Sequence, residues 1–274
     1  VVAPAPQHVA VTICHATPPD TAANGYTKIV TDDDGVLNQG HASQHGADII
    51  PPFVIGNTNY PGKNWDATGQ AIWNNNCVAT GGLKAVKVVD DGSPLTAWSF
   101  QLDNNAPVSA NASGIVDFGQ VTAGPHTITE IGQASYTITG VSGTNCVKNE
   151  GNSATATVGV GTTTVCTFSN AVNKGSITIV KDALPNDAQD FGFTTTGLEV
   201  SSFTLDDDGD NENGVSNSAT FSDLLPGTYS FVEGEVSGWA LQGMNCVSSN
   251  VSLDMPVSST ATVTLHPGEN VTCT

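Results

Sequence analysis

Short runs of alternating apolar and polar residues dominate the chain, and turns rich in Gly, Pro and Asn separate them. Residues 8–14, 154–158 and 261–265 show the pattern most clearly, since nearly every second side chain in each run is apolar. An alternation with a period of two places the apolar side chains on one face of a β-strand. The pattern therefore predicts a mainly all-β protein built from antiparallel strands.

One segment near the N-terminus has a different spacing. Residues 64–73 carry Trp65 and Trp73 two helical turns apart, and we expect a short helix here with Asn64 as its N-cap. Residues 1–80 are therefore expected to form a small α+β domain. Its other predicted elements are strands at residues 8–14 and 26–30 and a turn at the acidic residues 32–35.

The rest of the chain is an internal repeat, in which residues 81–172 are matched by residues 173–274. Both copies contain, in the same order, a strand with a Lys, a second apolar strand, a turn with one Pro and one Gly, and a strand that ends in Glu. These landmarks lie at residues 83–88, 98–102, 123–125 and 126–130 in the first copy, and at 177–182, 203–205, 225–227 and 229–233 in the second. Alternating strands between turns predict tandem Ig-like β-sandwiches behind the α+β domain. The predicted domains are thus 1–80, 81–172 and 173–274, and the last strand of the third is incomplete.

The cysteines follow the same repeat. Residues 144–147 recur as 244–247, and residues 164–167 recur as 271–274, so each copy carries two cysteines. One pair per domain is the most economical of the many pairings that six cysteines allow. It favours the disulfides Cys146–Cys166, Cys246–Cys273 and Cys14–Cys77, and such a framework indicates an oxidising compartment.

Cys14 stands next to His15, which raises a cysteine nucleophile with a histidine base as an alternative. Adjacent residues on a strand point to opposite faces, so His15 is poorly placed to act on Cys14. A zinc site built on Cys-x-x-Cys is excluded because that spacing does not occur. We therefore expect Cys14 to be half of a disulfide, and we do not expect an enzyme.

The charge balance narrows the range of partners. Asp and Glu number 26 against 7 basic residues, all of them Lys, and the formal net charge is -19. Nucleic acid and anionic membranes require basic patches, so neither is an expected partner. No apolar run approaches the roughly 18 residues of a membrane span. Abundant Thr, Ser, Asn and Gly are typical of secreted bacterial surface proteins, and Val1 in place of Met indicates a mature or trimmed chain.

The best candidates for metal ligands are His15, His41, His45 and Asp48. His41 and His45 lie in a turn between Gly40 and Gly46, and imidazoles suit zinc or another divalent transition metal. The alternative is a hydrogen-bonded loop that the Cys14–Cys77 disulfide organises. A divalent metal ion is the sole cofactor that the sequence suggests.

A second acidic segment suggests calcium through Asp206, Asp208 and Asp210, as does the run at residues 32–34. Neither segment has the ligand spacing or the distal Glu of an EF-hand loop. A solvated acidic loop is the preferred interpretation of both.

The repeat resembles the SpaA-like domains (prealbumin-like, collagen-adhesin B-type) of bacterial surface proteins and pilins. The resemblance rests on the Lys of the first strand, the Pro-Gly-Thr-Tyr turn at residues 226–229 with Glu233, and the strand Cys-Thr-Phe-Ser-Asn at residues 166–170. Residues 9–78 resemble an N-terminal module that precedes such domains in secreted bacterial proteins. The motifs that carry this second likeness, which begins with Cys-His-Ala-Thr, lie at residues 14–17, 48–53 and 60–65.

The resemblance implies an autocatalytic isopeptide bond between Lys87 and Asn170, with Glu130 as the proton shuttle. The attacking amine must be neutral, which requires a buried lysine, and a carboxyl group in the same apolar site can donate a proton to the amide. Lys87 interrupts an apolar strand, where an unpaired charge is costly. The alternative is a plain ion pair between Lys87 and Glu130.

The second copy keeps Lys181 and Glu233 but departs from the pattern at the third position. An Asn equivalent to Asn170 would lie four residues after Cys273, and the sequence ends at Thr274. No isopeptide bond from Lys181 is therefore expected within these residues. An incomplete sandwich exposes a strand edge, and residues 1–11 are a candidate donor strand from a neighbouring subunit.

Together these features predict an extracellular structural protein, a subunit of a stalk or pilus-like fibre on a bacterial surface. Its expected partner is a second copy of itself, joined head to tail. The alternative is an adhesin with residues 1–80 as the tip, which would bind a host or matrix glycan or protein. Exposed aromatic side chains at Trp65 and Trp73 would support that alternative.

Overall fold

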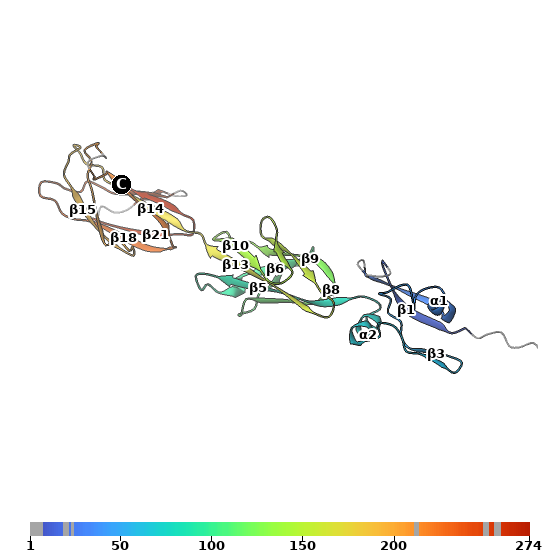
Figure 1. The fold of residues 1–274 in the computed structure, drawn as a ribbon. Coiled ribbons are helices and arrows are strands. Elements are labelled where there is room, and N and C mark those ends of the chain that lie inside the picture. Colours follow the sequence, from blue (N-terminus) through green and yellow to red (C-terminus); the bar gives the residue numbers. More distant parts are fainter. Residues whose placement is uncertain (1–7, 19–21, 23–24, 211–213, 249–251, 255–258) are drawn as a thin grey trace, which may run out of the picture. The chain divides into compact units, whose positions relative to one another are not determined.

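Most of the regular secondary structure in the computed structural model is β-strand, which confirms the predicted fold class (Figure 1). It describes residues 8–18, 22, 25–210, 214–248, 252–254 and 259–274. Most of the candidate donor strand, residues 1–7, lies outside the described residues. Neither described α-helix is long and apolar enough to cross a membrane.

By its internal contacts the chain divides into two compact units. The first comprises Val1–Val88, Ser93–Gly132 and Thr139–Ser169, and the second comprises Val89–Gly92, Gln133–Ile138 and Asn170–Thr274. The division into domains 1–80, 81–172 and 173–274 therefore stays a prediction, and the regions are described below one at a time.

The N-terminal region combines short strands with two helices, of which the sequence predicts one, at residues 64–73. Its elements are β1 (Ala10–Ala16), β2 (Tyr26–Asp32), α1 (Asp33–Leu37), β3 (Phe53–Ile55), β4 (Thr58–Tyr60) and α2 (Ala67–Asn74). Strands β1 and β2 form an antiparallel pair, and β3 and β4 form another. Two small clusters of buried side chains hold the region together, one around Val11, Ile13, Val36 and Ile50 and the other around Cys14, Ile49, Ile72 and Cys77.

Two local predictions in this region are wrong. The acidic run at residues 32–35 does not form an isolated turn but begins α1, where the Asp32 carboxylate caps the helix by accepting the Gly35 N–H at 2.7 Å. Asn64 is not the cap of α2. That role belongs to Asp66, whose carboxylate accepts the Gly69 N–H at 2.8 Å.

The first copy of the repeat folds into two facing sheets. Its strands are β5 (Thr80–Val89), β6 (Ser99–Leu102), β7 (Val108–Ser109), β8 (Ile115–Thr122), β9 (Gly124–Ile131), β10 (Tyr136–Ser142), β11 (Cys146–Lys148), β12 (Ser153–Val158) and β13 (Thr163–Val172). One sheet has the order β10-β13-β5-β8 and the other β11-β12-β9-β6-β7. Large buried side chains such as Trp98, Phe100, Ile128 and Phe168 fill this sandwich.

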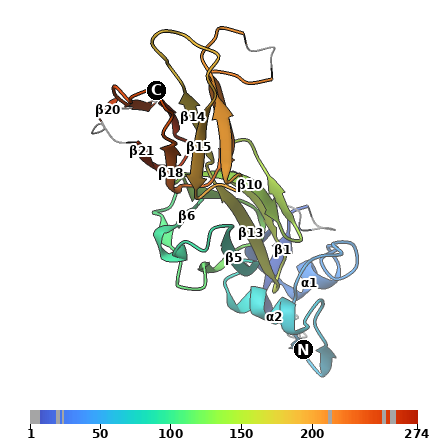
Figure 2. The same cartoon turned by 90° about the vertical axis from the view of Figure 1, so that its left-hand side faces the viewer.

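The second copy also forms two sheets, and several of their strands are labelled in Figure 2. Its strands are β14 (Gly175–Val180), β15 (Phe191–Thr196), β16 (Ser202–Leu205), β17 (Ser218–Leu224), β18 (Gly227–Glu233), β19 (Asn245–Ser248), β20 (Ser252–Asp254), β21 (Thr260–Leu265) and β22 (Asn270–Cys273). One sheet has the order β17-β14-β22-β19-β20 and the other β16-β15-β18-β21. The final strand, β22, runs parallel to β14, with Ile179 opposite Cys273.

Three disulfides join the pairs that the repeat favours, Cys14–Cys77, Cys146–Cys166 and Cys246–Cys273. The first ties β1 to the residues after α2, and each of the others lies within one copy of the repeat. Each bridge therefore closes a loop within a single predicted domain.

Candidate functional site

His15 and Asp48 are brought together by a short piece of β-pairing in the N-terminal region. Cys14 and Ile49 form an isolated antiparallel bridge, in which each backbone N–H donates to the other residue's carbonyl, at 2.9 and 3.0 Å. The next pair outward from such a bridge is His15 and Asp48. The Ala16 N–H also donates to Asp48 Oδ1 at 2.8 Å, so the carboxylate is anchored to β1.

His41 and His45 reach the same point from the loop between α1 and β3. The backbone N–H groups of Gln44 and His45 both donate to the Gly40 carbonyl, at 2.7 and 3.0 Å, which closes a helix-like turn. Residues four apart on such a turn lie on the same side. Gly40 has a φ of 100°, a conformation that favours glycine.

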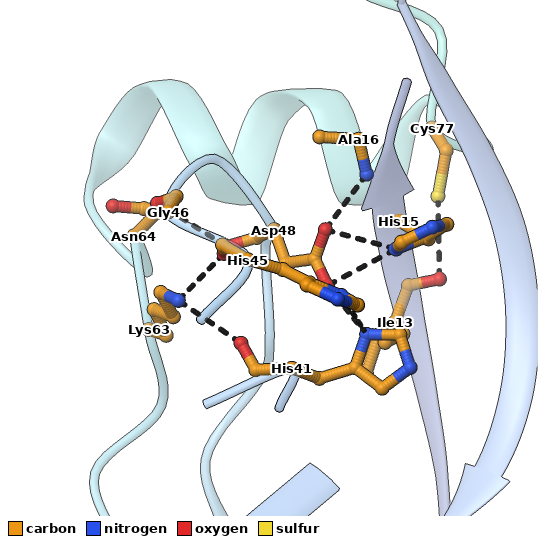
Figure 3. Close-up of polar contacts among 10 residues, drawn as sticks. All are labelled: Ile13, His15, Ala16, His41, His45, Gly46, Asp48, Lys63, Asn64 and Cys77. Carbon is orange, nitrogen blue, oxygen red and sulfur yellow. Dashed lines mark hydrogen bonds and ion pairs between the residues drawn. The ribbon is translucent and has the colours of Figure 1, made fainter. Parts of the chain in front are cut away.

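Lys63 and Asn64 fasten this loop from a second direction (Figure 3). The Lys63 ammonium donates to the carbonyls of His41 and His45 at 2.9 and 2.6 Å. The Asn64 side-chain amide donates to the carbonyls of Gly46 and Asp48 at 3.0 and 2.8 Å. The sequence did not predict that Lys63 and Asn64 hold this loop, although both residues belong to the motif at residues 60–65.

The result is a compact cluster of three imidazoles around one buried carboxylate (Figure 3). His15 Nδ1 lies 3.1 Å from Asp48 Oδ1, and His41 Nδ1 lies 2.6 Å from Asp48 Oδ2. His45 Nδ1 lies 3.1 Å from His41 Nδ1 and 3.4 Å from Asp48 Oδ2. The Asp48 side chain is 0% exposed, whereas the imidazoles of His15, His41 and His45 are 26%, 15% and 26% exposed.

The surroundings keep Asp48 ionised. Burial by itself would raise the pKa of this carboxyl group, but hydrogen bonds from the Ala16 N–H, His41 and His15 outweigh burial and hold the pKa below its ordinary value. Nearby, burial raises the pKa of the Tyr26 hydroxyl, and the negative charges of Asp48 and Asp66 raise it further. The cluster thus presents a fixed negative charge beside three imidazoles.

The two tryptophans of the region do not form an exposed aromatic surface. Trp65 and Trp73 contact each other edge to face at 5.6 Å between ring centroids, and both pack against the Cys14–Cys77 cluster. The Trp73 indole N–H donates to the Thr12 carbonyl at 3.2 Å. Their half-buried rings act as packing for the disulfide.

A second candidate site lies inside the first sandwich. Lys87 on β5 and Glu130 on β9 come from the two facing sheets, and Lys87 Nζ lies 2.9 Å from Glu130 Oε2. Both side chains are 0% exposed. The ammonium also lies 4.0 Å from the centroid of the Trp98 ring. Burial lowers the pKa of Lys87, and the hydrogen bond and charge of Glu130 only partly offset this effect.

Asn170 lies on β13, the neighbour of β5 in the sheet. Every second residue of β13 is buried, so Asn170 shares its inward face with Cys166 and Phe168. The Phe168 carbonyl itself lies 3.5 Å from Lys87 Nζ. The lysine, the glutamate and the asparagine therefore all belong to the interior of one sandwich.

The equivalent pair in the second sandwich is more open. Lys181 follows β14, Glu233 ends β18, and their charged atoms lie 3.2 Å apart. Their side chains are 14% and 15% exposed, and Phe191 takes the place of Trp98 at 4.2 Å from the ammonium. The repeat thus preserves the arrangement of the pair but not its complete burial.

One of the calcium candidates, Asp208, accepts a local backbone hydrogen bond. Asp208 Oδ1 accepts the N–H of Asp210 at 2.7 Å, and the neighbouring Asp207 Oδ2 accepts the N–H of Ala183 at 2.9 Å. Among the described residues, two groups of His and acidic side chains converge closely enough to hold an ion, and Asp206, Asp208 and Asp210 belong to neither. The second group, His8 with Asp33 and Asp34, was not singled out from the sequence.

Comparison with known protein families gives one match, and it falls on the second copy of the repeat. Residues 177–274 match the family described as a prealbumin-like fold domain. This segment is similar to prealbumin-like domains. The match begins in β14 and ends with the last residue of the sequence, so it includes Lys181, Glu233 and the Cys246–Cys273 disulfide. No curated protein matches the chain.

Solved structures with a similar course of the chain include a Bacillus anthracis protein, a pilin and a pilus adhesin fragment. The Bacillus anthracis TIE protein is 18% identical with a TM-score of 0.44, and the match covers 90% of this chain and 37% of that protein. The major pilin of Streptococcus pyogenes is 15% identical with a TM-score of 0.35, over 71% of this chain and 96% of that one. A C-terminal fragment of the pilus adhesin SpaC from Lactobacillus rhamnosus GG is 12% identical with a TM-score of 0.37, over 70% and 94%.

Proposed function

We propose that the protein is an extracellular structural subunit of a bacterial surface stalk or pilus-like fibre. The observation that carries this proposal is the wholly buried Lys87–Glu130 pair between the two sheets of the first sandwich, with Asn170 on the same interior. One disulfide within each predicted domain supports the same function, because disulfides persist in an oxidising exterior. The similarity of residues 177–274 to prealbumin-like domains supports it as well.

A permanently ionised pair is a costly way to fill a core. Removing two charges from water is rarely repaid in full by their attraction, and apolar residues of similar volume are often equally stabilising. The lowered pKa of Lys87 points to a different use, since a deprotonated amine is a nucleophile. A covalent bond to Asn170 removes the charge from the lysine and joins β5 to its neighbour β13.

The reaction needs only these three side chains. The neutral Lys87 amine attacks Cγ of Asn170, the new C–N amide bond forms, and the original C–N bond of the carboxamide breaks. Glu130 passes a proton from the amine to the departing nitrogen, which leaves as ammonia. No oxidant, reductant or cofactor takes part.

The intact mass of the reduced and denatured chain tests the bond. We expect a mass one ammonia below that of the sequence, and a peptide map in which Lys87 and Asn170 are joined. Glu130→Gln should restore the full mass, because the proton shuttle is lost. Glu233→Gln is the matched control in the second sandwich, and its mass should stay one ammonia below the mass of its own sequence.

The bond is refuted if the unaltered chain carries the full mass and an unmodified Lys87. Lys87 and Glu130 are then the buried ion pair that was the alternative. The fibre itself is tested separately, by electron microscopy of the native surface material with an antibody to this chain. Decorated filaments are the expected result, and labelled material without filaments would contradict the proposal.

A tip adhesin is not favoured. That alternative depends on exposed aromatic side chains in the N-terminal region, and Trp65 and Trp73 are instead half-buried against the disulfide. Binding of residues 1–80 to a glycan array would instead support the adhesin alternative.

A further inference from the structure

We propose that His15, His41, His45 and Asp48 bind one divalent transition-metal ion, with zinc as the best match. The site is independent of the isopeptide chemistry, since it shares no residue with the Lys87 pocket. Its role is to lock the loop of residues 41–48 onto β1.

The spacing of the four ligand groups fits an ion at their centre. A zinc ion holds imidazole nitrogens at about 2.0–2.1 Å, so atoms at neighbouring corners of the tetrahedron are about 3.3 Å apart. The Nδ1 atoms of His15, His41 and His45 lie 3.2, 2.6 and 3.4 Å from Asp48 Oδ2, and those of His41 and His45 lie 3.1 Å apart. Three of these four distances are close to the tetrahedral edge, and the distance from His41 to Asp48 is shorter. All four candidate ligand atoms lie within 4.8 Å of one another.

The few hydrogen atoms that the imidazole nitrogens can carry also favour a bound cation over hydrogen bonds alone. An imidazole Nδ1 carries either one proton or one lone pair in the ring plane. His41 Nδ1 lies 2.6 Å from the Asp48 carboxylate, which requires a proton, and 3.1 Å from His45 Nδ1. One proton cannot serve both contacts well. A central cation accepts the lone pairs of all three Nδ1 atoms and of the carboxylate together.

The ligands are held in place before any ion arrives. Asp48 is fixed by the Ala16 N–H and by the Cys14–Ile49 bridge, which lies beside the Cys14–Cys77 disulfide. The Lys63 ammonium fixes the backbone of His41 and His45 without occupying a ligand atom. Supporting contacts of this kind orient the ligands of metal sites and raise their affinity.

The chemistry of the ligands selects the class of ion. Three imidazoles and one carboxylate suit zinc and its neighbours cobalt, nickel and copper, whereas calcium and magnesium prefer all-oxygen sites. Four protein ligands complete a tetrahedral shell, which is the pattern of structural rather than catalytic zinc. The three imidazoles are each partly exposed, so an ion can enter from solvent.

The test uses the full chain, freed of metal with a chelator and titrated with zinc chloride by calorimetry. We expect one equivalent of zinc per chain and a higher midpoint of thermal unfolding with zinc than without it. His45→Gln should weaken zinc binding at least tenfold, which is about the loss expected even for residues that only support a metal site. His45 is partly exposed, so this variant should retain the fold, and retention of the Cys14–Cys77 disulfide in a peptide map checks that it does.

His8→Gln is the matched control, because His8 with Asp33 and Asp34 forms the other converging group. This variant should bind zinc as tightly as the unaltered chain. Cobalt chloride provides a second readout, since tetrahedral cobalt gives strong visible absorption that His45→Gln should abolish. The proposal is overturned if the unaltered chain binds no stoichiometric zinc, or if His8→Gln loses binding while His45→Gln keeps it.

Discussion

The two sandwiches of the repeat place a lysine and a glutamate in the same positions but surround them differently. In the first, Lys87 and Glu130 are sealed between the sheets against Trp98. In the second, Lys181 and Glu233 keep 14% and 15% exposure beside Phe191. Exposure to water screens a charge pair, so one sequence pattern yields a strongly coupled pair in one copy and a weakly coupled pair in the other.

The largest difference is expected when each glutamate is removed. Glu130→Ala removes the proposed proton shuttle and leaves a buried lysine without its partner or its bond to Asn170, which should cost about 3–5 kcal/mol of the free energy of unfolding. Glu233→Ala leaves a lysine that water can reach, and the cost should be about 1 kcal/mol or less. Hydrogen–deuterium exchange, read separately for peptides of each sandwich, measures both. Equal losses in the two sandwiches would show that burial does not distinguish the pairs.

The next effect concerns the disulfides, whose removal should lower the stability of the two sandwiches by similar amounts. Cys146–Cys166 and Cys246–Cys273 span 20 and 27 residues. The loop-closure model then assigns about 3–4 kcal/mol to each. Replacing each pair by Ala should therefore destabilise its own sandwich by a similar amount in urea unfolding. A large inequality would mean that the two sandwiches differ in more than the lysine pocket.

The smallest effect concerns His126 in the first sandwich, whose ring makes two hydrogen bonds. His126 donates from Nδ1 to Asp103 at 2.8 Å and from Nε2 to the Thr122 carbonyl at 2.7 Å. Burial lowers the pKa of His126, but these two hydrogen bonds outweigh burial and raise the pKa above its ordinary value. His266 in the second sandwich is mostly exposed and pairs with Glu269 at 2.9 Å.

A raised pKa in the folded state fixes the direction of the pH effect. The stabilisation from His126 should be complete below the ordinary histidine pKa of about 6.5 and should be lost as pH rises through the folded value. Asp103 is partly exposed, so the loss should stay below about 1 kcal/mol. Urea unfolding of the first sandwich between pH 5 and pH 9 measures it, and His126→Gln should remove the dependence. A slope that persists in this variant would assign the effect to another group.

The repeat explains why so much of the fold could be predicted. Alternation placed the strands, and two copies of one cysteine pattern left a single economical pairing, which the three disulfides match. The N-terminal region has no second copy to compare with. There the run at residues 32–35 predicts a turn, although Asp is also an ordinary N-cap residue and Asp32 caps α1 in the structure.

The sequence by itself determined the strands, the pairing of the cysteines and the presence of a lysine and a glutamate in each sandwich, because these depend on local periodicity and internal duplication. Only the tertiary structure decided how deeply each pair is buried, since burial depends on which side chains the facing sheet supplies. It also decided the histidine cluster. His15 and Asp48 are 33 residues apart and meet through the bridge between Cys14 and Ile49. Lys63 and Asn64 hold the loop from elsewhere in the chain, and no local pattern encodes contacts of that range.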